Sequence, residues 1–287
     1  MGVTGERSTG EGLAVARFQG VLITEVPESL TARVEILRSG KAFQYDLYQL
    51  DLAQVELADC DLSGAKLVGC DLRNADLTGT RLVESDLRGC DLRGAKLIQA
   101  DLTGACLSRS RLEGAHLSQA VVEELRVGFA RYDAETQWPE GFEWRKSGAI
   151  GPGASLAGAM LNTVELAGAD LSGANLMGAY LSGTNLKGAN LKGARLSGAM
   201  LSKACLMGAF LKDARLSNVD LEMTDCRGAD FSGVEIEIVG SIAGADFYRA
   251  QNMSDSLRSF LLGRSSGELN TRNSFTRRTT KESLLAS

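Results

Sequence analysis

The chain has 287 residues and a formal net charge of −5, and 44% of its residues are hydrophobic. This apolar content excludes a disordered chain, while an aromatic content of 6% means that the core must be aliphatic. The acidic balance argues against direct nucleic-acid binding, no apolar run approaches the ~20 residues of a membrane span, and the N-terminus lacks the apolar segment of a signal peptide. We therefore expect a cytoplasmic protein with no membrane or nucleic-acid partner.

Residues 1–44 are predicted to form a flexible N-terminus followed by a β-rich N-terminal cap. Residues 1–11 hold little apolar sequence and are expected to be flexible. The runs VLITEV and ARVEIL lie on either side of Pro27 and are rich in β-branched residues, which favour strands. We therefore expect a β-rich N-terminal cap over the open end of the fold that follows.

A period of five residues organises residues 45–125. Leucine stands at every fifth position from Leu47 to Leu117, with a small residue, usually Ala, two positions earlier and often Gly two positions later. This period fits neither the 3.6 residues of a helical turn nor the alternation of a strand. The chain must therefore turn a corner in each unit, with the leucine and the small residue inside and the other three residues outside.

The same pattern returns over residues 154–239, but the register between the two blocks fails. Leu117 and Leu156 are 39 positions apart, which is not a multiple of five. We therefore expect residues 126–153 to form an inter-block loop. Its large aromatic residues either pack against the neighbouring units or form a protein-binding loop. As candidates for protein binding we name Trp138, Phe142 and Trp144.

Residues 240–263 are predicted to form a C-terminal cap with one short helix. Ser254 is typical of a helix N-cap, and Gly263 is typical of a helix end. Leu257, Phe260 and Leu261 recur on one helical side. The helix is expected to close the end of the fold or to pair with a second copy, giving a homodimer.

Residues 264–287 are rich in Ser, Thr and Arg and are expected to be a disordered basic tail. This tail could act as a tether. Residues 277–280, which read RRTT, could alternatively be a phosphorylation target, although the motif is weak.

The repeating unit, A-D/N-L-x-G in segments such as ADLTG and ANLKG, resembles the pentapeptide-repeat family. The segment ARYDAETQWPEGF is similar to one found beside the repeats of bacterial members, which implies a bacterial protein. The resemblance implies an all-β fold, a right-handed quadrilateral parallel β-helix with four pentapeptides in each square coil. Residues 20 positions apart then stack at about 4.8 Å. We expect this solenoid in two blocks, with the loop between them and the short capping helix at the C-terminal end.

Catalytic and cofactor-binding residues are not expected. His116 is the only histidine and occupies an outward position, and no phosphate-binding G-x-x-x-x-G-K-S/T sequence occurs. The sequence therefore predicts a protein that is not an enzyme and that holds no cofactor or metal. The alternative, an enzyme, would require a further site within residues 126–153.

The six cysteines are expected to divide between core and surface. Cys60, Cys70 and Cys90 fall in the inward row where Ala is usual, and we expect them to serve as small apolar residues rather than to form a disulfide. Cys226 replaces a core leucine, whereas Cys106 and Cys205 are expected to face outward and to be open to modification.

Charge in the first block bears on one known activity of the family. Quinolone-resistance members resemble duplex DNA and bind DNA gyrase through an acidic face. Residues 45–125 hold 14 acidic and 8 basic residues, and Asp51, Asp71 and Asp91 should stack in a column. The neighbouring arginines interrupt this column, so inhibition or protection of a type II topoisomerase by DNA mimicry is the alternative rather than the leading hypothesis.

The leading hypothesis is a rigid, non-catalytic scaffold or adaptor that binds a protein partner. The main observation in its favour is a stripe of large side chains in the second block: Met160, Tyr180 and Met200. They are 20 positions apart and should project outward in one column, where a contiguous apolar patch is typical of an interface. The alternative is that they are scattered surface residues of the ordinary kind.

Overall fold

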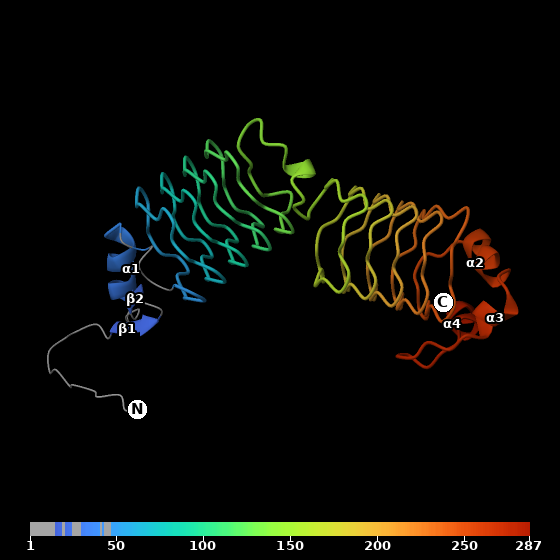
Figure 1. The fold of residues 1–287 in the computed structure, drawn as a ribbon. Helices are drawn as coiled ribbons and strands as arrows, with labels where there is room; N and C mark the ends of the chain where they lie inside the picture. Colours follow the sequence, from blue (N-terminus) through green and yellow to red (C-terminus); the bar gives the residue numbers. More distant parts are fainter. Residues whose placement is uncertain (1–14, 19–20, 25–29, 41, 43–46) are drawn as a thin grey trace, which may run out of the picture. The chain divides into compact units, whose positions relative to one another are not determined.

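The computed structural model describes residues 15–18, 21–24, 30–40, 42 and 47–287. Near the N-terminus, strands β1 (Val15–Phe18) and β2 (Val21–Thr24) pair antiparallel and are followed by helix α1 (Leu30–Arg38) (Figure 1). The strand predicted for ARVEIL is therefore wrong. Leu30, Val34 and Leu37 recur at intervals of four and three, which is also the spacing of one helical side. The flexibility expected of residues 1–11 lies outside the described residues.

The chain divides into two compact units. Unit 1 contains residues 1–130 and 135–142, and unit 2 contains residues 131–134 and 143–287. Within each unit, parallel β-bridges join residues 20 positions apart, as in Asp71↔Asp91 and Tyr180↔Met200. Four pentapeptides therefore complete one coil, and each unit consists of stacked coils (Figure 1).

The inside of the coils is aliphatic, as expected. Leu62 N donates to the carbonyl of Arg81 at 2.7 Å, so Leu62 and Leu82 stand in one column, and both are at most 1% exposed. Ala often fills the small inward row, and Val55 and Val219 are also buried there. Some thiols and hydroxyls in this row donate to a carbonyl of the preceding coil, as Cys90 does to Leu67 O at 2.9 Å and Thr80 to Leu57 O at 2.8 Å.

The inter-block loop predicted over residues 126–153 is wrong for much of its length. Cys106↔Arg126 continues the bridges of unit 1, and Gln137 N donates to Ala115 O at 2.9 Å. Val127 and Tyr132 are buried at inward positions five residues apart. The period thus continues beyond Leu117 with residues other than leucine, which hid it in the sequence. A short 3-10 helix, η2 (Trp144–Lys146), follows in unit 2.

A cap of three helices covers the last coils of unit 2. Helix α2 (Asp255–Leu262) begins after the Ser254 N-cap and ends at Gly263, which confirms the predicted helix. Its Leu257 and Leu261 are buried inside the chain, so a homodimer through this helix would have to use its other side.

The disordered tail predicted for residues 264–287 is wrong. The segment forms α3 (Ser266–Asn270) and α4 (Thr280–Leu285), joined by an arm whose ends meet in an antiparallel bridge, Arg272↔Thr279. Leu284 is fully buried, and Thr280 Oγ1 donates to Ile242 O at 3.0 Å. Covering the last coil therefore orders the tail. It also buries Thr280, so phosphorylation there would require the cap to open.

Among the described residues, no helix is both long and apolar enough to cross a membrane.

Candidate protein-binding face

The predicted stripe forms one continuous column on the coils of unit 2. Parallel bridges join Met160 to Tyr180 and Tyr180 to Met200, which confirms the alignment. The three residues are 61%, 38% and 43% exposed, respectively. Their role in binding stays a prediction.

The backbone beneath the stripe holds these side chains outward. Tyr180 N donates to Ala159 O at 2.9 Å, and Leu181 N donates to Met200 O at 2.8 Å. Leu181, next in the chain, is fully buried. Because neighbouring residues of an extended segment point to opposite sides, burial of Leu181 directs Tyr180 to solvent.

A second column on the same face is polar but uncharged. It consists of Asn162, Ser182 and Ser202, with Ser182 N donating to Asn162 Oδ1 at 3.0 Å. The two columns together form what we call the Tyr180 face: Met160, Asn162, Tyr180, Ser182, Met200 and Ser202.

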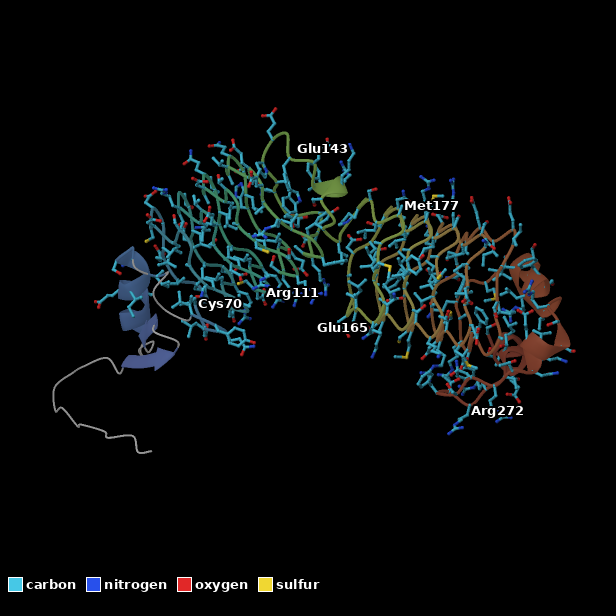
Figure 2. The ribbon with its side chains drawn as sticks, in the orientation of Figure 1. Cys70, Arg111, Glu143, Glu165, Met177 and Arg272 are labelled. Carbon is cyan, nitrogen blue, oxygen red and sulfur yellow. The ribbon has the colours of Figure 1, made fainter. Side chains whose placement is uncertain are left out.

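The other three faces of the same coils all carry charge. Arg195 lies on one, Glu165 and Lys187 on the second, and Asp170 and Lys192 on the third. Figure 2 shows Glu165 and Met177 projecting outward from different sides of unit 2. The Tyr180 face thus combines exposed apolar side chains with an absence of charge among its six residues.

The Tyr180 face ends at an acidic coil. Asp220 follows Met200 in the column, and Glu222 follows Ser202. Asp220 Oδ2 accepts from Ser202 Oγ at 2.7 Å. One end of the face is therefore negatively charged.

The aromatic candidates of residues 126–153 are partly buried, and they belong to different units. In unit 1, the ring centroids of Trp138 and Phe142 are 5.3 Å apart. In unit 2, the Arg145 guanidinium lies 4.9 Å from the Trp144 ring centre. These contacts agree with packed aromatic rings, and a binding role for them stays a prediction.

Three carboxylates of unit 1, Asp71, Asp86 and Asp91, are each paired with an arginine two positions along the chain. Arg73 and Asp71 form a two-pronged ion pair, and Arg88 pairs with Asp86 in the same way, at 2.6 Å. Hydrogen bonds from these guanidinium groups hold the pKa values of Asp71 and Asp86 below the ordinary range. The column of Asp51, Asp71 and Asp91 therefore exists as predicted, and arginines compensate the charges of Asp71 and Asp91.

The structure places His116 and the six cysteines at different depths. His116 Nε2 lies 2.8 Å from Ser118 Oγ on the outside of a coil. Cys106, expected to face outward in the open, is only 8% exposed because its thiol is covered near Ser108. Cys60, expected in the core, is partly exposed. Within the described ranges, no three His, Cys, Asp or Glu side chains are grouped to hold a metal ion.

Known proteins share this architecture. The profile of the pentapeptide repeats family matches eight copies, in segments 56–94, 80–119, 147–176, 174–213 and 211–237, which together span just over half of the chain. The chain belongs to the pentapeptide-repeat family. Members of this family fold as right-handed quadrilateral β-helices, which agrees with the 20-residue bridge spacing.

Several solved pentapeptide-repeat structures are similar in sequence to parts of this chain. HetL, involved in heterocyst differentiation regulation in the cyanobacterium Nostoc sp. strain PCC 7120, is 32% identical over 70% of this chain and 78% of HetL, with a TM-score of 0.29. Alr5209 from Nostoc is 33% identical over 42% of this chain and 93% of its own, with a TM-score of 0.36. QnrB1, a plasmid-mediated fluoroquinolone resistance protein, is 20% identical over 75% of this chain and 96% of its own, with a TM-score of 0.28. Among curated proteins, none matches this sequence significantly.

Proposed function

We propose that this pentapeptide-repeat protein is a non-catalytic scaffold that binds another protein through the Tyr180 face. The observation that carries the proposal is the column of Met160, Tyr180 and Met200, exposed in register beside the uncharged column of Asn162, Ser182 and Ser202. A cytoplasmic location is part of the same proposal.

The chemistry of the face suits a protein interface. The centres of interfaces are depleted in charged residues and enriched in aromatic residues and Met, and Tyr is frequent among the residues that dominate binding energy. Met160 and Met200 add flexible side chains that adapt to a partner's shape. The closed, hydrogen-bonded coils beneath hold the face in place, so little order has to be gained on binding.

Site-specific photo-crosslinking in the source organism tests this proposal. A benzophenone side chain is placed at position 180, and a control is placed at position 210. Phe210 is 53% exposed on another face of the same unit. We expect one protein to be captured from position 180 and not from position 210. Capture of the same proteins from both positions, or of none from position 180, would overturn the proposal.

DNA mimicry has less support than protein binding through the Tyr180 face. It needs a continuous face of uncompensated carboxylates, whereas Asp71, Asp86 and Asp91 each pair with an arginine two positions along the chain. A gyrase supercoiling assay tests this alternative, because a DNA mimic inhibits or protects the enzyme at micromolar concentration.

A further inference from the structure

Most backbone groups beneath the Tyr180 face already form hydrogen bonds between coils. Leu161 N donates to Tyr180 O, and Met200 N donates to Ala179 O, both within 2.9 Å. The same coil-to-coil pattern continues on either side of these residues. Because these coil-to-coil bonds are already made, the face favours a partner that is recognised through side chains, which is how amphipathic helices are bound.

The spacing of the column favours a helix lying along the solenoid axis. Coils repeat at about 4.8 Å, so Met160 to Met200 covers about 9.6 Å. Two turns of an α-helix cover about 10.8 Å and present an apolar residue at each turn. In an extended strand, every second residue lies on the same side. Three such residues would cover about 13.4 Å, so they would not align with the three residues of the column.

One corner beside the Tyr180 face differs from the other corners of these coils. It holds Thr163, Gly183, Lys203 and Met223, all with positive φ. In the coils from residue 153 to residue 244, the other non-glycine residues with positive φ are Asp213 and Asn218, which are types that tolerate this conformation. Thr163, Lys203 and Met223 tolerate it poorly, yet all three lie at the corner next to the stripe. Thr163 and Lys203 are exposed there, so their side chains are accessible to a partner that contacts the stripe.

Charged residues beside the Tyr180 face favour one orientation of a bound partner. Lys203 is exposed at the corner, and Asp220 and Glu222 lie at the end of the face. A complementary partner carries acidic side chains along the flank that meets Lys203 and basic side chains at the end that meets Asp220 and Glu222.

We infer that the Tyr180 face, together with the Thr163–Lys203–Met223 corner, binds an amphipathic α-helix of a partner protein, aligned with the solenoid axis. The helix places one apolar residue against each of the three coils, an acidic flank on Lys203 and a basic end over Asp220 and Glu222. This inference rests on the proposed function and specifies the partner.

Synthetic peptides test the geometry against the full-length protein. The first peptide is a stapled 18-residue helix with leucines three and four residues apart, glutamates on one flank and arginines at one end. The second has the same composition with leucines at every second position and no staple. Binding is followed by NMR of protein labelled with ¹³C-methyl methionine. We expect the helical peptide to shift the Met160 and Met200 signals and to leave the signal of the buried Met253 in place.

Matched variants locate the contact. Tyr180→Ser is expected to weaken binding of the helical peptide about tenfold, whereas Phe210→Ser, on another face, leaves it within about twofold. Lys203→Glu is expected to weaken binding about threefold, and a peptide with lysines in place of the flank glutamates restores it. Lys212→Glu, on the opposite side of the coil, is the control. Equal binding of the alternating peptide, or no shift of Met160 and Met200 up to ~1 mM peptide, overturns the inference.

Mapping the crosslink from position 180 separates the two proposals. A captured helix with apolar residues three and four apart supports both. A captured extended segment keeps the proposed function and overturns the helix. Failure to capture any protein from position 180 overturns both.

Discussion

The guanidinium of Arg278 lies over the ring of Tyr248, with Cζ 3.9 Å from the ring centre. Its Nη1 is also 3.6 Å from Oδ2 of Asp246, which is fully buried. Arg278 therefore fastens the arm between α3 and α4 to the last coils of unit 2. Figure 1 shows this arm leaving the helical cap.

Arg278→Ala is expected to destabilise the C-terminal cap. The change removes a cation–π contact and the ion pair of a buried carboxylate, so we expect a loss of about 2–4 kcal/mol in the free energy of unfolding. Urea denaturation measures the loss, and hydrogen exchange over residues 266–285 locates it. The neighbouring Arg277 is exposed, and Arg277→Ala should change stability by less than about 0.5 kcal/mol. Equal effects of the two substitutions would contradict this role of Arg278.

Thr163→Gly is expected to stabilise the fold. Thr163 is a β-branched residue at φ 58°, where its side chain is strained. Relief of the strain exceeds the entropy cost of glycine, and we expect a net gain of about 0.5–1 kcal/mol in urea denaturation. Asn218→Gly is the control, because Asn at φ 57° tolerates this region. An equal gain in the free energy of unfolding for both variants would contradict the claim that Thr163 is strained at this position.

Much of the fold follows from the five-residue period, since a repeat that turns a corner in each unit fixes which residues stack. The column of Leu62 and Leu82 was predictable in this way. The inward position of Val127 in unit 1 was not, because the residue is not leucine. An inward position requires only an apolar side chain of suitable size.

The ordered tail escaped prediction for another reason. Leu284 and Thr280 are ordered by the last coil that they cover, and composition does not reveal such a contact. A local signal did exist: Thr279 and Glu282 form a capping box, which marks the start of α4.

The candidate face was partly predictable. The 20-residue spacing of Met160, Tyr180 and Met200 in the sequence predicts that they align. The strained corner at Lys203 is visible only in the backbone φ angles of the structure.

Acid should reduce the contribution of the arginine–aspartate pairs in unit 1. Arg73 and Arg88 hold the pKa values of Asp71 and Asp86 below the ordinary value of about 3.9. The pairs therefore stabilise the folded state above about pH 4, and this stabilisation is lost as the pH falls through the lower folded-state pKa values. We expect Arg73→Ala with Arg88→Ala to lower the free energy of unfolding slightly at pH 7, by an amount that shrinks at acidic pH. A difference from the unsubstituted protein that stays constant with pH would contradict the pairing.

Thiol labelling should distinguish the cysteines by depth. Cys70, Cys90 and Cys226 are fully buried, and burial raises the pKa of the Cys226 thiol. Cys60 and Cys205 are partly exposed.

Two thiols of the folded protein are therefore expected to react promptly with an aromatic disulfide reagent, and all six in urea. The buried thiols become accessible only when the coils open, so they should react at least ~10³-fold more slowly, because local opening of a core costs several kcal/mol. Cys205→Ser should remove one prompt equivalent, whereas Cys226→Ser should leave the prompt count at two. Prompt labelling of Cys226 in the native protein would mean that the coils around it are open, which is incompatible with the hydrogen bond from Cys226 N to Asp246 O at 2.9 Å.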